Sequence, residues 1–420
     1  MSDTLHTMAT DACLAARHCA EIDATTRDAA LHCMAQALRA FSPEILAQNE
    51  RDMATAQTEC RTDAYLDRLR LTDERIESMA QGLESIATLP DPLGKVLEQR
   101  TLGSGIRLSR ISVPLGVVGI IYEARPNVTS DAAGICIKSG NACILRGGSG
   151  AFYSNRMIAR TLDRAACAAG LPSHLIQMIE TTDRSATDEM LHLHGLIDVI
   201  IPRGGSGLIH HCVENSSVPV IETGLGNCHI YVHKDADLSI AVPIVVNAKC
   251  QRPGVCNAAE SLLVDRSIAD QALPLLFDAL VSHNVTMHVD EATAQRAQRC
   301  DVAFVAATED DWAKEYLGLE MSIKVVDGID EAIDHINRYG TGHSESIITT
   351  NAEASQLFSQ RVDAAVIYTN ASTRFTDGGM FGLGAEIGIS TQKLHVRGPF
   401  AVEALTTYKY VMQGTGQVRA

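Results

Sequence analysis

The sequence predicts an α/β protein built on doubly wound parallel sheets. Between residues 126 and 222, strand-like segments run into glycine-containing turns and then into helical segments, and this order repeats. The same alternation returns over residues 240–370. Strand, turn and helix at this spacing indicate parallel βαβ units. A composition of 46% hydrophobic and 20% charged residues is that of a globular protein and excludes wholesale disorder.

Chain length and charge limit the number of domains and the kind of partner. A chain of 420 residues suits about two to three domains. The 35 Lys and Arg against 51 Asp and Glu leave a net charge of −16, which argues against nucleic acid or an anionic membrane as partner. Without an apolar run of about 18 residues or an apolar N-terminal signal segment, we expect a cytoplasmic protein. The 12 cysteines are dispersed without zinc-finger spacing, so we expect reduced thiols and no metal site.

The N-terminal part is expected to form helices and then two strands. Apolar residues three and four positions apart predict helices over residues 1–90. The run Ser42-Pro43-Glu44 predicts a helix start capped by the serine hydroxyl. Residues 95–123 are rich in β-branched residues and predict two strands around a turn at 114–116. The first of these strands is expected at a sheet edge.

The two α/β stretches divide into elements of ordinary length. Helices are expected near residues 128–139, 151–170, 184–193, 208–215 and 267–283. Strands are expected at residues 142–146, 174–180, 196–201, 218–222, 259–265, 302–306, 323–327, 345–350, 364–370 and 403–412.

The string RGGSG occurs twice, at 146–150 and 203–207, each time after a strand and before a helix. Backbone N–H groups freed by glycine, together with the positive end of the following helix, can bind an anion such as phosphate. A plain tight turn is the alternative for both strings. Arg146 ends its strand where it could reach a phosphate, or it is a solvated strand-end arginine.

Two further positions carry possible chemistry. Cys256 follows Pro253-Gly254 in a loop and lies near Arg252, so it is a candidate nucleophile with a lowered pKa. Cys250 is the competitor for this role. Asn127 opens a helix after a strand, where its amide could donate to an oxyanion or cap the helix.

Longer strings resemble the aldehyde dehydrogenase superfamily. They include IYEARPNVTSDAAGICIKSGNACILRGGSGA, PVIETGLGNCHIYV and NAKCQRPGVCNAAESLLV, and they run in order from about residue 121 to 411. The resemblance implies a Rossmann-like cofactor domain (1–105 and 122–235), an α/β catalytic domain (236–375) and a small β oligomerisation flap (106–121 and 395–420). Because a flap of this kind pairs with a neighbouring subunit, a homo-oligomer is expected.

The resemblance also implies site residues. Cys256 matches the nucleophile, and Asn127 matches the side-chain donor to the oxyanion. Arg146 matches the residue that meets the adenosine ribose and its 2′-phosphate. The remaining implied cofactor residues are Gly204, Gly205 and Ser206 for the pyrophosphate and Glu320 for the nicotinamide ribose. Positively charged candidates for substrate binding are Arg125, Arg252 and Arg374.

The activity implied by the resemblance is the NADPH-dependent reduction of L-glutamyl 5-phosphate to L-glutamate 5-semialdehyde and phosphate in proline biosynthesis, through a cysteine thioester. Water would hydrolyse that thioester, so we do not expect Glu222 to act as a water-activating base. The alternatives are an aldehyde or acyl-phosphate dehydrogenase with another substrate, and a nucleotide-binding scaffold without chemistry. A glutamate kinase is a further possible partner.

Overall fold

The computed structural model describes residues 2–419, and its chain divides into two compact units. Unit 1 comprises Met1–Thr223, Gly382–Gly388 and Phe400–Ala420. Unit 2 comprises Gly224–Phe381 and Ile389–Pro399. Each unit has a parallel sheet with helices, so the predicted α/β class is confirmed. No helix within residues 2–419 is long and apolar enough to cross a bilayer.

Unit 1 is built on a four-stranded parallel sheet in the order β5-β4-β3-β6. Its strands are β3 (Val117–Tyr122), β4 (Ala142–Gly147), β5 (Ile176–Met178) and β6 (Val199–Arg203). Helix α6 (Pro126–Lys138) connects β3 to β4, α7 (Phe152–Ala168) connects β4 to β5, and α8 (Ser185–Leu191) connects β5 to β6. Strand order reverses beside β3, and in such sheets ligands bind in the crevice at that switch point.

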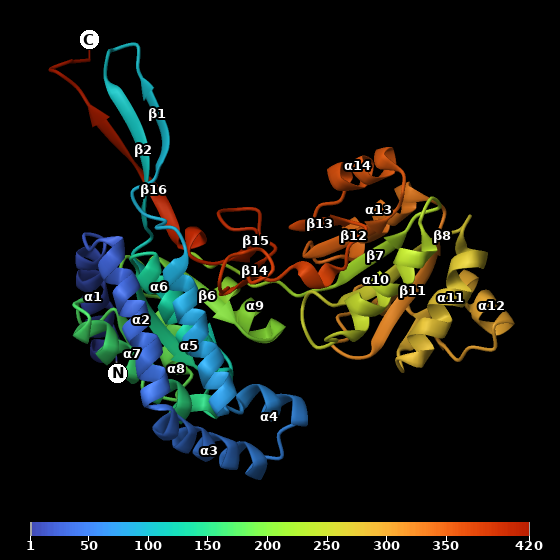
Figure 1. The fold of residues 1–420 in the computed structure, drawn as a ribbon, viewed down its shortest axis with the longest axis horizontal. Helices are drawn as coiled ribbons and strands as arrows, with labels where there is room; N and C mark the ends of the chain where they lie inside the picture. Colours follow the sequence, from blue (N-terminus) through green and yellow to red (C-terminus); the bar gives the residue numbers. More distant parts are fainter. Residues whose placement is uncertain (1, 420) are drawn as a thin grey trace. The chain divides into compact units, whose positions relative to one another are not determined.

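The N-terminal helices cover this unit as predicted. They are α1 (Ser2–Cys19), α2 (Ala24–Ala40), α3 (Ser42–Thr58), α4 (Asp63–Leu69) and α5 (Asp73–Thr88). Helix α2 packs against α5 and α7 through its buried apolar face (Figure 1). The predicted cap of α3 is wrong, because Ser42 is already helical and its hydroxyl donates to Asp73 Oδ1 at 2.9 Å.

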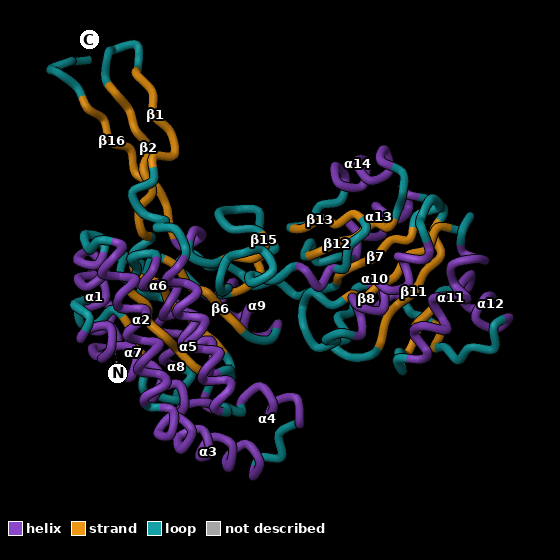
Figure 2. Tube along the Cα trace, in the orientation of Figure 1, coloured by secondary structure: helices purple, strands orange, loops and turns teal. Residues whose placement is uncertain are grey.

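Three strands of unit 1 form a separate antiparallel sheet (Figure 2). They are β1 (Val96–Thr101), β2 (Arg107–Pro114) and β16 (Thr406–Gln413). The expectation that residues 106–111 form an edge strand is wrong, because β1 pairs with one side of β2 and β16 with the other. The three-stranded sheet thus includes residues 96–101, which were expected in the cofactor domain. Residues 117–121 of the predicted flap lie instead in the four-stranded sheet. The functional roles of these domains remain predictions.

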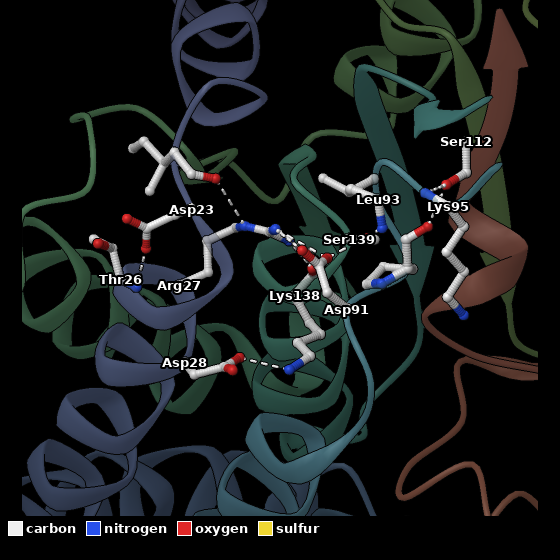
Figure 3. Close-up of polar contacts among 12 residues, drawn as sticks. Asp23, Thr26, Arg27, Asp28, Asp91, Leu93, Lys95, Ser112, Lys138 and Ser139 are labelled. Carbon is white, nitrogen blue, oxygen red and sulfur yellow. Dashed lines mark hydrogen bonds and ion pairs between the residues drawn. The ribbon is translucent and has the colours of Figure 1, made fainter. Parts of the chain in front are cut away.

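Two buried charges join helix α2 to helix α6 and to the loop before β1, and a hydroxyl of β2 binds the same loop (Figure 3). The guanidinium of Arg27 is 2% exposed and donates to both carboxylate oxygens of Asp91 at 3.0 and 2.9 Å. Lys138 is also buried and donates to Asp28 Oδ1 at 2.6 Å. The Ser112 hydroxyl on β2 donates to the carbonyl of Pro92 at 2.6 Å. Each buried charge is therefore paired, which keeps its burial from costing several kcal/mol.

Unit 2 contains a seven-stranded parallel sheet in the order β10-β9-β11-β8-β7-β12-β13. The strands are β7 (Cys228–Val232), β8 (Ala259–Asp265), β9 (Thr286–Val289), β10 (Val305–Ala306), β11 (Glu320–Val326), β12 (Ser344–Ile348) and β13 (Val366–Thr369). The helices are α10 (Leu238–Cys250), α11 (Ala269–Ser282), α12 (Glu291–Arg299), α13 (Ile329–Tyr339) and α14 (Ala352–Arg361). Ile230 packs in the cluster with α10 and α11, whereas Tyr231 packs in the cluster with α13 and α14. Since neighbouring residues of a strand point to opposite faces, helices cover both faces of the sheet.

One predicted strand is absent in the described chain. Residues 218–222 make only an isolated bridge between Val220 and Ile200. Pro219 lacks the N–H group that a longer ladder would need. The remaining α-helix in the described chain is α9 (Ser206–Asn215), and the remaining strands are a short pair, β14 (Gly388–Ser390) and β15 (Gly398–Phe400).

Candidate active site

Cys256 lies in the loop between α10 and β8 of unit 2, where its side chain is half-buried. The backbone of Gly226 lies directly against this residue: a Cβ on Gly226 would be 1.6 Å from the carbonyl oxygen of Cys256. The thiol of Cys228 donates to the same carbonyl oxygen at 3.2 Å. The main chain that carries Cys256 is therefore held by the segment leading into β7.

These residues meet because the strands of the sheet are parallel. Cys228 begins β7 and is in register with Ala259, which begins β8 just after Cys256. Ser344 begins the neighbouring strand β12. The amino ends of parallel strands share one edge, so the loop with Cys256 lies at the amino edge of the sheet. Sequence analysis missed Gly226 and Cys228, and the glycines of the 224–226 segment were the available signal.

A buried chain of hydrogen bonds lies behind Cys256. Cys228 Sγ is 3.6 Å from His343 Nδ1, which also contacts Ser344 Oγ at 2.8 Å. Ser344 Oγ is 2.6 Å from Thr376 Oγ1, and the Thr376 carbonyl accepts from the Asn257 amide at 2.8 Å. Burial raises the pKa of Cys228 well above its usual range and lowers the pKa of His343 to about 4. Both groups are thus neutral near pH 7, which suits positioning rather than proton transfer.

The surroundings of Cys250 differ from those of Cys256. Cys250 ends α10 and packs against the apolar cluster of that helix, and burial raises its pKa. Near Cys256, by contrast, the guanidinium of Arg374 is held by Gln251 Oε1 at 2.8 Å. Burial first and then the exposed Arg252 lower the pKa of Arg374, so these two predicted substrate residues lie within electrostatic range of each other.

A buried ion pair flanks the same loop. Lys249 Nζ and Glu260 Oε2 are 2.5 Å apart, and both side chains are fully buried. Glu315, which sequence analysis also missed, accepts from the backbone N–H of Gly226 at 2.9 Å, and burial raises its pKa. Glu315 thus holds Gly226, whose backbone lies against Cys256, and the Lys249–Glu260 pair joins the residues on either side of the loop.

Glu320, predicted to bind the nicotinamide ribose, begins β11 at the same edge of the sheet. Its Oε2 contacts His288 Nε2 at 3.1 Å. Its role remains a prediction.

In unit 1, a cavity of about 470 Å³ opens at the carboxyl ends of β3 and β4, beside α9. We call it the unit 1 cavity; its lining includes Glu123, Arg146, Asp188, Gly207, Leu208 and His211. Arg146 is 7% exposed and donates to the carbonyls of Thr182 and Asp183 at 3.3 and 3.1 Å. The alternative of a solvated arginine is therefore wrong. Its buried Nε has no hydrogen-bond partner among the described residues.

The second RGGSG string fits an anion better than the first. Helix α9 begins at Ser206, its N-cap residue Gly205 has no side chain to cap it, and a Cβ on Gly207 would meet nothing within 4 Å. In the first string a Cβ on Gly150 would be 1.9 Å from the Tyr65 hydroxyl, so this glycine serves packing. A buried guanidinium nitrogen without a partner among the described residues, the N-terminus of α9 and the open space at Gly207 suit the phosphates of a dinucleotide.

Asn127 is the second residue of α6, and Arg125 occupies the cap position. The alternative role of Asn127 as a helix cap is therefore wrong. Its exposed amide donates to Asp131 Oδ2 at 3.2 Å, and burial raises the pKa of Asp131 to about 6.

Comparison with known proteins agrees with this architecture. The model of the aldehyde dehydrogenase family matches residues 2–299, so the chain belongs to that family. A γ-glutamyl phosphate reductase of Moorella thermoacetica is 55% identical over 405 residues, covering 96% of each chain. The crystal structure of γ-glutamyl phosphate reductase from Thermotoga maritima shares 45% identity over 99% of each chain, with a TM-score of 0.96. The Saccharomyces cerevisiae enzyme of that name is 30% identical, covers 99% of this chain and 98% of its own, and gives a TM-score of 0.53.

Within the family, the chain groups with the proteins named γ-glutamyl phosphate reductase, and it is an oxidoreductase. The predicted family and enzyme class are thus confirmed.

Proposed function

We propose that the protein reduces L-glutamyl 5-phosphate with NADPH, giving L-glutamate 5-semialdehyde and phosphate for proline biosynthesis. The observation that carries this proposal is the placement of Cys256. Its main chain is fixed by Gly226 and Cys228, its side chain is half-buried, and Arg252 and Arg374 supply positive charge nearby. A cysteine in such surroundings is disposed to ionise and attack.

In this mechanism the Cys256 thiolate attacks the carbonyl carbon of the acyl phosphate. The oxyanion is held by the backbone N–H of Cys256 and by the Asn127 amide; one such donor is typically worth about 2.7–4 kcal/mol. Phosphate leaves with the bonding electrons, and a thioester remains on Cys256. Arg125, Arg252 and Arg374 are the proposed partners of the substrate's anionic groups.

The reductant is proposed to be a nicotinamide dinucleotide, which when bound supplies a hydride to the thioester carbonyl. Arg146 would hold the 2′-phosphate, and Glu320 would hold the nicotinamide ribose. Gly204, Gly205 and Ser206 would meet the pyrophosphate at the start of α9. Glu222 is proposed to have no water-activating role.

The test is an assay of the reverse reaction, the semialdehyde- and phosphate-dependent reduction of NADP. We expect Cys256→Ser to abolish turnover while NADPH still binds, and Cys250→Ser to keep most of it. Activity that persists in Cys256→Ser and disappears in Cys250→Ser would transfer the role to Cys250. Activity that needs no phosphate would favour an ordinary aldehyde dehydrogenase.

The assembly is part of the proposal. The three-stranded sheet exposes apolar side chains such as Tyr408, Tyr410 and Met412, and it is proposed to pair with a neighbouring subunit. We also propose that the homo-oligomer acts in the cytoplasm, where a glutamate kinase would deliver the unstable acyl phosphate.

A further inference from the structure

Glu123 lies between the two RGGSG turns. It follows β3, and its backbone N–H donates to the carbonyl of Arg203 at 3.1 Å. A Cβ on Gly148 of the first turn would be 3.3 Å from the backbone of Glu123. A Cβ on Gly204 of the second turn would be 2.8 Å from the Glu123 carboxyl group. The absence of side chains at both glycines therefore makes room for this one acidic residue.

The carboxylate of Glu123 also binds the second turn directly. The backbone N–H of Gly205, at the start of α9, donates to Glu123 Oε1 at 3.0 Å. No side chain of α9 itself caps this helix start. A carboxylate at this position is stabilised by the positive end of the helix and by a charge-assisted hydrogen bond.

The residue that accepts from this N–H group, Glu123, also lines the unit 1 cavity. Glu123 lines this cavity together with Gly207 and Leu208 of α9 and with Arg146, whose buried Nε has no partner among the described residues. An anionic phosphate that reached the helix start from the cavity would meet the Gly205 N–H. One N–H cannot serve two anions fully, and the two negative charges repel each other at close range.

We infer that Glu123 occupies the phosphate position at the start of α9 before the dinucleotide binds, and that it competes with the cofactor for the Gly205 N–H. This inference rests on the proposed function, because it takes the unit 1 cavity as the dinucleotide site. The contact keeps the glycine turn ordered in the empty protein. It also lowers the affinity for the cofactor.

The experiment is a titration of the purified protein with NADPH, in which calorimetry measures the binding affinity. Glu123→Gln removes the charge, and Glu123→Asp keeps it but shortens the side chain. Asp188→Asn is the matched control: it removes a charge from the same cavity, but that carboxylate contacts His211 Nε2 at 2.8 Å and not the glycine turn. Adenosine 2′-monophosphate serves as a second ligand because it contains no pyrophosphate.

We expect Glu123→Gln to bind NADPH about tenfold more tightly, since wild type must first break a charge-assisted hydrogen bond. Glu123→Asp should bind NADPH more tightly than wild type as well. Neither change should alter binding of adenosine 2′-monophosphate, and Asp188→Asn should tighten NADPH binding much less than Glu123→Gln does.

Three results would overturn the inference. In the first, folded Glu123→Gln and Glu123→Asp bind NADPH no better than wild type. In the second, they bind it worse, which would make the carboxylate a ligand of the cofactor. In the third, Asp188→Asn tightens binding as much as Glu123→Gln, which would show a general charge effect.

Failure of the proposed function would look different, because wild type would then bind no dinucleotide at all. In that case, titration with inorganic pyrophosphate still tests whether Glu123 competes with a phosphate for the Gly205 N–H. It should bind Glu123→Gln more tightly than wild type, and equal affinity would overturn the inference.

Discussion

Gly226→Ala tests whether the segment before β7 positions Cys256. The added Cβ would lie 1.6, 2.3 and 2.5 Å from the carbonyl oxygen, carbonyl carbon and Cα of Cys256. Real Cβ atoms essentially never approach other heavy atoms closer than 3.0 Å, so one of the two backbones must move by about 1.4 Å. All three atoms are main chain, so no side-chain rotation relieves the clash. Misplacement of a reacting group by about 1 Å costs on the order of 100-fold in rate.

We therefore expect Gly226→Ala to lower kcat by about 100-fold or more, with NADPH affinity unchanged. The measurement combines steady-state kinetics with the rate at which iodoacetamide alkylates Cys256. Gly254→Ala is the control in the same loop, because its Cβ would meet only the Leu317 carbonyl at 3.7 Å, an ordinary contact. If Gly226→Ala stays within about threefold of wild type in kcat, the segment does not position Cys256.

Two further predictions concern stability. Glu260→Gln leaves the fully buried Lys249 ammonium without its carboxylate, so we expect the free energy of unfolding in urea to fall by about 3–5 kcal/mol. The double variant with Lys249→Met should regain most of this stability. A double variant as unstable as Glu260→Gln would contradict the pairing argument. Asp131→Asn should stabilise the protein above pH 6, because burial raises the pKa of Asp131 from 3.8 to about 6 and the folded state then carries a costly charge. The gain should reach at most about 3 kcal/mol and vanish as the pH falls below about 3, where the carboxyl is protonated in both states; a gain that does not change with pH would rule out this explanation.

The α/β architecture could be predicted because its strands are buried on both faces and its helices have apolar faces. Runs such as β8 are wholly buried and appear in the sequence as continuous apolar segments. Strand β1 could not be found in this way, because all but one of its residues are exposed. It is a strand through its backbone pairing with β2, and no hydrophobic pattern records such pairing.

The candidate site was predictable only in part. Cys256 could be named as a candidate because a proline and a glycine precede it in a loop, and Arg146 because it ends a strand before glycines. The roles of both residues remain predictions. Gly226 and Glu315 were missed because they are 89 residues apart in the sequence and meet only through the fold. The resemblance pointed to Glu320, five residues further on, but the structure links Glu315 to Gly226 and pairs Glu320 with His288.

The candidate residues of unit 1 lie at the carboxyl edge of its sheet, and those of unit 2 lie at the amino edge of its sheet. This difference explains which of them could be predicted. In unit 1 the glycine turns follow β4 and β6, at the carboxyl ends where α/β proteins bind ligands, so strand, glycine and helix stand together in the sequence. In unit 2 the loop with Cys256 precedes β8 and meets the amino ends of β7 and β12. Helix dipoles favour anions at the first kind of edge. At the second kind, positive charge must come from side chains such as Arg252 and Arg374, so Cys256 depends on tertiary contacts that no local motif contains.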